Sequence, residues 1–293
     1  DGNLAGYNAD DYNIDNIQPG RSLLYLHGVT GENRFLLAAE RLIDQLRTHP
    51  RTRSGVYWHK LRYPWQIWLD GLYMGHPFQI EYGNLTGDDE LVSDGMKQVA
   101  TALEQTYVPS TGLYAHAFDE AKKQKWADAT SGHPQAHWGR ALGWLAMALV
   151  DIAEIVSEDE FAPLRDQTTA LLNKIVSLKT DHNLWLQVVD QPNLVGNFEE
   201  TSASAMFVYA FTKAASLGLW HQEFVQPEAL FDAVLKTDVD GRLAMSEICH
   251  VAGLGAFQDR YRDGTAAYYV SENCVNDDPK GVGPLMNLAA ITL

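Results

Sequence analysis

The segment from residue 63 to residue 80, YPWQIWLDGLYMGHPFQI, carries one formal charge, Asp70, among aromatic and aliphatic residues. A carboxylate that loses its water costs several kcal/mol unless it pairs with a cation or takes up a proton. A carboxylic acid that burial keeps protonated near neutral pH can donate its proton to a substrate. The structural alternative is a carboxylate that caps a neighbouring helix or pairs with an arginine. Asp70 is therefore our first candidate catalytic residue.

A second carboxylate, Asp15, stands between isoleucines in DDYNIDNIQPGR and is expected to point inward. The acidic start of this stretch resembles a calcium-binding loop, but Asn16 and Ser22 replace the glycine and glutamate that such a loop needs. Clusters of aspartate and asparagine also form ordinary turns and caps. We predict no metal site. If Asp15 is ionised near Asp70, like-charge repulsion would raise the pKa of Asp70 further.

The stretch HWGRALGWLAMAL combines an arginine with two tryptophans and two glycines. Gly139 and Gly143 are one helical turn apart and permit a close approach of another helix. Arg140 and Trp144 share a helical face, so the guanidinium can stack on an indole and present its fork to a carboxylate. Packing alone is a sufficient explanation for Trp138 and Trp144, but a buried arginine needs an anion.

His116, in YAHAFDE, alternates with Tyr114 and Phe118 and is placed to face a site, although a histidine within a turn fits equally well. Nucleotide-binding glycine loops, zinc-protease motifs and serine-hydrolase elbows are absent from the sequence. The sequence therefore indicates acid–base chemistry by carboxylates, without a metal or other cofactor.

Helical periodicity dominates the elements that must position these residues. Apolar residues recur every three to four positions in six stretches, which predict amphipathic helices. These stretches cover residues 34–46, 91–105, 140–156, 161–178, 201–217 and 227–236. The segment 63–80 is apolar nearly all round, and we expect a buried helix with Trp65 and Trp68 on one face.

A short turn motif, a small or polar pair before an aliphatic residue, recurs between the helical stretches. It places Leu4, Val56, Leu113, Leu184 and Leu243 at intervals of 52 to 71 residues. A unit of two helices and a turn, repeated at this period, indicates stacked helical hairpins. We predict a single all-α domain over residues 1–293, in which hairpins close into a six-hairpin toroid around a cavity.

Composition restricts the partners. The chain has 293 residues and a formal net charge of −16, which argues against nucleic acid and anionic membranes. No apolar run is long enough to span a bilayer. Two cysteines make no disulfide framework, and the absence of a signal peptide favours a cytoplasmic location, although the chain begins without methionine. A few local cations would still let an acidic protein hold an anionic small molecule, and the oligomeric state stays undetermined.

Five motifs in order resemble the unsaturated rhamnogalacturonyl hydrolases, glycoside hydrolase family 105: YNIDNIQPG, WLDGLYMGHPF, YAHAFDE, HWGRALGW and NDDPKGVGP. The resemblance covers essentially the whole chain. It implies an (α/α)6 barrel, lacking the first N-terminal helices that family members have. It also implies removal of a Δ4,5-unsaturated galacturonyl residue from the oligosaccharides that pectin lyases leave.

Carried over by motif, Asp70 would match the general acid/base of the family and Asp15 its second active-site aspartate. The resemblance and the aromatic stretches together give the candidate substrate-binding residues, which are His59, Trp68, His116, Trp138, Arg140 and Trp144. Three enzymatic alternatives stay open: an unsaturated glucuronyl hydrolase, a conventional inverting glycosidase with the two aspartates as a pair, and a polysaccharide lyase. A non-catalytic sugar-binding protein is the alternative outside enzymology.

Overall fold

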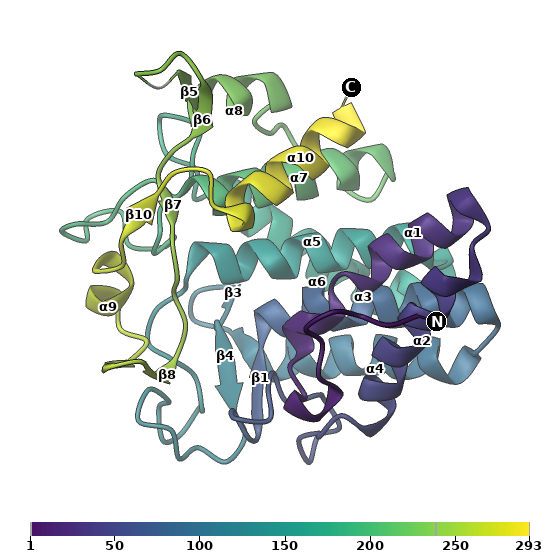
Figure 1. Cartoon of the computed structure of the whole chain (residues 1–293). Coiled ribbons are helices and arrows are strands. Elements are labelled where there is room, and N and C mark those ends of the chain that lie inside the picture. Colours follow the sequence, from purple (N-terminus) through teal and green to yellow (C-terminus); the bar gives the residue numbers. More distant parts are fainter. Residues whose placement is uncertain (1, 238, 293) are drawn as a thin grey trace.

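The computed structural model describes residues 2–237 and 239–292, and most of this chain lies in helices (Figure 1). All six helices predicted from periodicity are confirmed. The helices are α1 (Gly20–Thr30), α2 (Asn33–Thr48), α3 (Leu69–Thr86), α4 (Asp89–Thr106), α5 (Gly139–Ile155), α6 (Glu158–Val176), α7 (Thr201–Ser216), α8 (Pro227–Val234), α9 (Ala266–Val270) and α10 (Pro279–Thr292), with the 3-10 turns η1 (Ala9–Asp11) and η2 (Ile14–Ile17).

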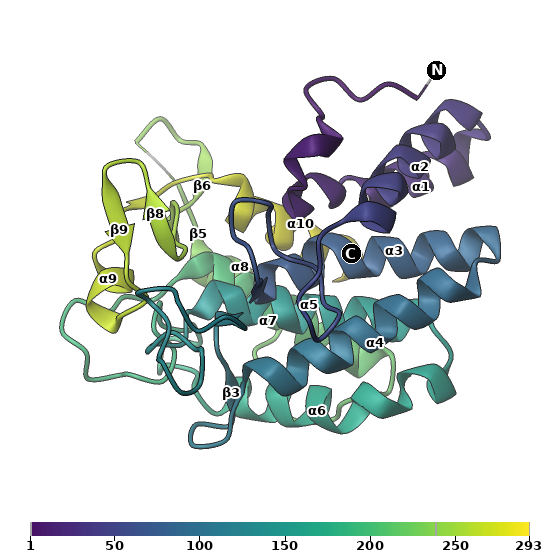
Figure 2. The same cartoon turned by 90° about the horizontal axis from the view of Figure 1, so that it is seen from below.

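Consecutive helices pair as hairpins, and one helix of each pair joins an inner row. Helices α1, α3, α5, α7 and α10 follow one another in this row, and α2, α4, α6 and α8 pack outside them. Figure 2 shows α4 and α6 beneath α3 and α5. The recurring turn motifs lie in the connections before the inner helices, although Asp1 of the first motif is outside the described residues. The predicted succession of hairpins is therefore present.

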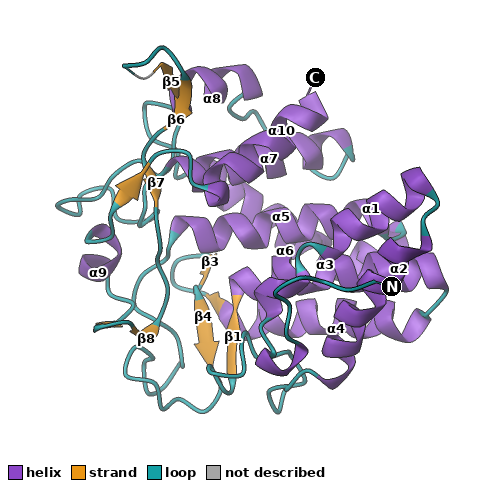
Figure 3. Cartoon of the chain, viewed as in Figure 1, coloured by secondary structure: helices purple, strands orange, loops and turns teal. Residues whose placement is uncertain are grey.

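Strands in the described residues form only two-stranded sheets within the connections (Figure 3). Each pair is antiparallel. The pairs are β1 (Gln66–Trp68) with β4 (Ala117–Asp119), β2 (Tyr107–Val108) with β3 (Leu113–Tyr114), β5 (Leu235–Thr237) with β6 (Leu243–Met245), β7 (Ile248–Cys249) with β10 (Cys274–Val275), and β8 (Gly255–Phe257) with β9 (Arg260–Arg262). In Figure 3 most of these strands lie around the end of the molecule at which α5 begins.

The prediction that Trp65 and Trp68 belong to the helix of Asp70 is wrong. Trp65 has a φ of 65°, in the left-handed region, and Trp68 closes β1 and caps α3 with extended backbone. The helix begins only at Leu69. Pairing of β1 with β4 competes successfully with helix formation here, because it satisfies the backbone of a buried segment. As a result Asp70 lies in the first turn of α3.

Glycines bring the elements of the site close together. A Cβ atom on Gly75 of α3 would lie 2.9 Å from the side chain of Ile14, so its absence lets η2 lie against α3. A Cβ atom on Gly143 would lie 2.6 Å from the sulfur of Met206, which explains how α5 approaches α7. The predicted role of Gly143 in close helix packing is therefore confirmed.

Candidate active site

A cavity of about 320 Å³ opens where the inner helices begin. Asp70, Arg140 and Lys280 line it, and each is the second residue of its helix: α3, α5 and α10, respectively. Free backbone N–H groups and the helix dipole make such helix starts favourable for anions. The full lining is Asp15, His59, Lys60, Arg62, Tyr63, Trp68, Asp70, Met74, Trp138, Arg140, Trp144, Val251, Ala252, Phe257, Arg262 and Lys280.

Asp70 faces this cavity with a histidine behind it. The Asp70 side chain is 16% exposed, and its Oδ2 lies 3.2 Å from Nε2 of His116, which is fully buried. Neither atom makes a well-aligned hydrogen bond, so the two side chains are in close polar contact of imperfect geometry. His116 Nδ1 lies 2.7 Å from the hydroxyl of Tyr269, which holds the ring in place. The predicted proximity of Asp70 and His116 to one site is thus seen in the structure.

The prediction of a raised pKa for Asp70 is wrong. Desolvation by burial is the largest single influence and raises the pKa of the carboxyl group, but His116, as donor and as charge, combines with weaker influences to hold the pKa below its usual value. His59 lowers it further. The sequence showed the aromatic surroundings of Asp70 and offered His116 as a candidate site residue, but it did not show that this histidine, 46 positions later, contacts Asp70.

Asp15, on η2, lies at the rim of the same cavity and is about one-third exposed. Its carboxylate pairs with Nζ of Lys60, and its Oδ1 is 3.6 Å from Nε2 of His59. The largest influences on the pKa of Asp70 are burial, His116 and His59. The expectation that an ionised Asp15 raises the pKa of Asp70 further is therefore not supported, and the charge of Asp15 is paired with that of Lys60.

Aromatic rings form one wall of the cavity. Trp68 lies nearly parallel to His59 and to Tyr63, with ring centroids 4.6 and 4.9 Å away. His59 is buried, and burial lowers its pKa to about 4, so the imidazole is neutral near pH 7. Trp144 stacks on Tyr73, 4.8 Å away. This wall gives flat apolar surfaces on which a sugar ring can rest.

Arg140 is fully buried, and its counter-ion is the carboxylate of another buried side chain, Glu200. Its Nη1 is 3.8 Å from Oε1 of Glu200 and donates hydrogen bonds to Ser202 Oγ and the carbonyl of Cys249. The guanidinium lies 4.8 Å above the ring of Trp138. The sequence had instead placed Arg140 and Trp144 on the same helical face. Its Nε has no hydrogen-bond partner among the described residues. Arg140 therefore keeps donor capacity while Glu200 balances its charge.

Several lining residues were not found from the sequence. Basic residues outnumber acidic ones in the cavity although the whole chain is acidic: five basic side chains stand against Asp15 and Asp70. The five are Lys60, Arg62, Arg140, Arg262 and Lys280. Only Lys280, in the motif NDDPKGVGP, had a sequence signal that could have been followed. Arg62 and Arg262 lie in connections without a recognisable pattern, and only the fold brings them here.

Within residues 2–237 and 239–292, no cluster of three or more histidine, cysteine, aspartate or glutamate side chains is arranged to hold a metal ion. In the same residues, every helix falls short of the length or apolar character that a membrane crossing requires.

The structure thus combines a row of helical hairpins with a carboxyl group and a basic, aromatic cavity at the starts of the inner helices. Comparison with known proteins identifies the class. The family model described as Glycosyl Hydrolase Family 88 matches residues 2–292. The chain therefore belongs to this family and is a glycoside hydrolase, and the resemblance noted in the sequence is confirmed.

Relatives support the assignment. The chain is 47% identical over 230 residues to Protein Atu3128 of Agrobacterium fabrum, covering 75% of this chain and 98% of that protein. It is 30% identical over 245 residues to the unsaturated rhamnogalacturonyl hydrolase YesR of Bacillus subtilis, covering 79% of this chain and 65% of YesR.

A solved structure confirms the fold. A family 105 glycoside hydrolase from C. acetobutylicum ATCC 824 superposes with a TM-score of 0.93 at 34% identity. The match covers 99% of this chain and 82% of that chain. The predicted (α/α)6 barrel class is thus confirmed.

Proposed function

We propose that this glycoside hydrolase removes a Δ4,5-unsaturated galacturonyl residue from rhamnogalacturonan oligosaccharides. The observation that carries the proposal is the cavity itself, in which a carboxyl group stands among five basic side chains and stacked aromatic rings. An unsaturated uronide needs these three features: a proton donor, cations for its C6 carboxylate, and flat surfaces for its ring. The similarity to YesR, named as such a hydrolase, supports the choice of sugar.

The substrate is an enol ether, in which the C4=C5 double bond adjoins the ring oxygen and the carboxylate. In the proposed mechanism, protonated Asp70 gives its proton to C4, which leaves an oxocarbenium ion at C5. Water adds to C5 and returns a proton to the Asp70 carboxylate. The hemiketal opens to a C5 ketone and a C1 hemiacetal, which then releases the leaving sugar. One water is consumed, and nothing attacks C1 directly.

This mechanism needs a protonated Asp70, whereas the surrounding protein, through His116 above all, holds the pKa of Asp70 below its usual value. In our proposal, substrate binding raises the pKa of Asp70, because the negative charge of the uronate and the exclusion of water both favour the neutral acid. The kcat/KM profile reports the free enzyme and the kcat profile the complex. We therefore expect kcat/KM to decline with rising pH at a lower pH than kcat does.

The test is an ultraviolet assay with purified protein. Loss of the double-bond absorbance of an unsaturated rhamnogalacturonan disaccharide would support the proposal, and a faster loss with an unsaturated glucuronyl disaccharide would assign the other uronide. Release of sugar from a saturated disaccharide alone would identify a conventional glycosidase, and a gain of absorbance from polymer would identify a lyase. Absence of any reaction would contradict the proposal.

Replacing His116 with glutamine should move the alkaline limb of the kcat/KM profile to higher pH. His116 is the group that lowers the pKa of Asp70 most, so its removal raises that pKa and keeps the acid protonated at higher pH. Measuring kcat/KM from pH 4 to pH 8 checks this. A profile that keeps its shape and only drops in height would show that His116 does not set the protonation of Asp70.

Replacing Arg140 with lysine should raise KM for the unsaturated disaccharide about five- to tenfold and leave kcat within a factor of about three. Lysine keeps a charge near Glu200 but loses the fork that can hold a uronate. The matched control is Arg51→Lys, in a pair with Asp94 that does not line the cavity. If KM is equal to that of the parent, Arg140 pairs with Glu200 but does not bind the substrate.

A further inference from the structure

The two cysteines of the chain lie directly opposite each other in the structure. Cys249 belongs to β7 and Cys274 to β10, and the register of this antiparallel pair makes the two residues partners. Both are free thiols, of which Cys249 is buried and Cys274 is exposed. Their positions along the sequence do not predict this placement, because it depends on the pairing of β7 with β10.

The hydrogen bonds around the two cysteines show how they face each other. The N–H of His250 donates to the carbonyl of Asn273 at 2.8 Å, beside the cysteine pair. The N–H of Cys249 donates to Glu200 instead, and its carbonyl accepts from Arg140. The cysteines therefore form a non-hydrogen-bonded pair, in which the Cα atoms are about 4.5 Å apart and both side chains point to the same face.

This geometry suits a disulfide. Bonded cysteines have Cα atoms roughly 4.4–6.8 Å apart, a range that includes the spacing of a non-hydrogen-bonded pair. The charges of Glu200 and Arg140 influence the pKa values of both thiols, so both sulfur atoms lie near the same charged pair. An approach of the Cβ atoms by about 1 Å would bring the sulfur atoms within bonding distance.

The segment between the cysteines, residues 250–273, supplies one side of the cavity that contains Asp70. We call this segment the cysteine loop. Its members that line the cavity are Val251, Ala252, Phe257 and Arg262. Tyr269 of the same loop contacts His116, the histidine beside Asp70. A bond between the cysteines would therefore act on a part of the chain that shapes the candidate active site.

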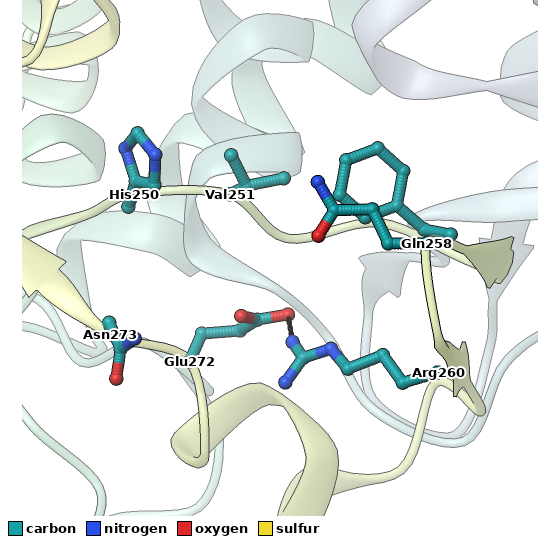
Figure 4. Close-up of a pocket in the computed structure, with 7 residues that line it drawn as sticks. His250, Val251, Gln258, Arg260, Glu272 and Asn273 are labelled. Atoms are coloured by element: carbon teal, nitrogen blue, oxygen red, sulfur yellow. Dashed lines mark ion pairs between the residues drawn. The ribbon is translucent and has the colours of Figure 1, made fainter.

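The cysteine loop also encloses a space of its own. All 7 residues drawn in Figure 4 belong to the loop, and they line a cavity of about 450 Å³. An ion pair between Arg260 and Glu272 joins the two sides of the loop, as the dashed line shows. Because a cavity separates the two sides, a bond at the base of the loop would limit how far they move apart.

We propose that Cys249 and Cys274 are an oxidisable pair, whose disulfide closes the cysteine loop and fixes its side of the cavity around Asp70. The formation of this disulfide is independent of the sugar that the enzyme cleaves. It would make the binding of substrate respond to the oxidation state of the surroundings.

The reaction is thiol–disulfide exchange with a low-molecular-weight disulfide such as oxidised glutathione. The exposed thiolate of Cys274 attacks one sulfur of that disulfide, breaks its S–S bond and releases one glutathione thiolate. The Cys249 thiol then loses its proton, and its sulfur attacks the sulfur of Cys274 and releases the second glutathione. Two protein thiols and one small disulfide thus become one protein disulfide and two small thiols.

Burial makes this reaction slow near neutral pH. It raises the pKa of the Cys249 thiol to about 12 and that of the Cys274 thiol to about 11, where the carboxylate of Glu247 adds to the effect. Only the thiolate attacks a disulfide, so the rate should rise about tenfold per pH unit between pH 7 and pH 9. The pair therefore responds to sustained oxidising conditions and not to brief ones.

Thiol counting and mass spectrometry of the whole chain test the pairing. After incubation with oxidised glutathione at pH 8, the folded wild-type protein should lose both thiols, keep no glutathione and remain a single chain on a non-reducing gel. Cys249→Ser should instead keep one glutathione on Cys274, and Cys274→Ser should stay unreacted because its remaining thiol is buried. Glutathione retained by the wild type, disulfide-linked dimers or two unreacted thiols would each overturn the proposal.

Amide hydrogen exchange measures the effect on the cysteine loop. Oxidation should slow hydrogen exchange within residues 250–273 about three- to tenfold, because the closed loop opens less often. Dithiothreitol should reverse the change, and Cys274→Ser treated in the same way is the matched control. Equal hydrogen exchange in the oxidised and the reduced wild-type protein would overturn the fixing of the loop.

A kinetic measurement connects the pair to the site. Pulling Cys249 toward β10 moves its carbonyl, which accepts a hydrogen bond from Arg140. Oxidation of the wild type should therefore raise KM for the unsaturated disaccharide about two- to fivefold and leave kcat within about twofold. Cys274→Ser should show no response to the oxidant, and an unchanged KM in the oxidised wild type would contradict the link to Arg140. If the enzyme cleaves no unsaturated uronide but the thiols pair and the loop is protected, the proposed function fails and the oxidisable pair stands.

Discussion

Replacing Asp70 with asparagine should lower kcat on the unsaturated disaccharide by a factor of about 10²–10⁴, the usual contribution of a general acid or base. Asparagine has nearly the shape of aspartate but cannot deliver a proton to C4 or take one from water. Since the amide still fits beside His116, the dissociation constant of the substrate should change by only a few-fold. Turnover from ultraviolet loss and affinity from calorimetry measure the two quantities separately.

The control for this variant is Asp166→Asn, an exposed aspartate on α6, which should leave kcat unaltered. Equal turnover in Asp70→Asn and the parent enzyme would refute the assignment of Asp70. Loss of turnover together with loss of substrate affinity would instead place Asp70 among the binding groups.

The second large effect concerns stability. Asp151, on α5, is 1% exposed and accepts hydrogen bonds from Tyr209 and Lys213 of α7, both at 2.7 Å. It also pairs with Arg21 of α1. Removing one member of a buried ion pair typically costs 3–5 kcal/mol, because the remaining charge stays buried. We expect Asp151→Asn to lower the free energy of unfolding by about 3 kcal/mol.

Denaturant titration measures this change, and Glu154→Gln is the matched control. Glu154 pairs with the same Lys213 at 2.6 Å, but its side chain is 48% exposed. Surface pairs contribute about 0–1 kcal/mol, so this variant should be nearly neutral. If both variants had the same small effect, the Asp151 cluster would not hold α1, α5 and α7 together.

Much of the fold could be predicted from the sequence, because a 3.6-residue apolar period depends on neighbours along the chain. The stripes at 34–46 and 201–217 each correspond to a helix in the structure. Helices α1 and α10 were not predicted. Glycine and proline interrupt α10, at Gly281 and Pro284 among others, and weaken its pattern. The boundary before α3 was misplaced because the pairing of β1 with β4, 50 residues away, decides it.

The features of the site could likewise be predicted from the sequence only in part. Asp70 could be found because a lone charge in an apolar segment is visible in the sequence. Its pKa could not be predicted, since the direction depends on whether His116 lies nearer than other groups. Arg262 reaches the cavity from a short hairpin almost 200 positions after Asp70. Distances across the fold, which no local pattern records, determine these contacts.

Three groups of the cavity occupy the second position of α3, α5 and α10, and this has a consequence for how the protein tolerates changes of length. Each residue added to a helix turns the following side chain by about 100°. An insertion just after the start of one of these helices would therefore leave the cavity side chain in place. It would rotate the rest of the helix, so that the apolar face of the helix no longer points into the core. A deletion at the far ends, such as the turn between α3 and α4, would change neither the position of the cavity side chain nor the direction of the apolar face. Natural length variation should therefore concentrate at the helix ends remote from Asp70.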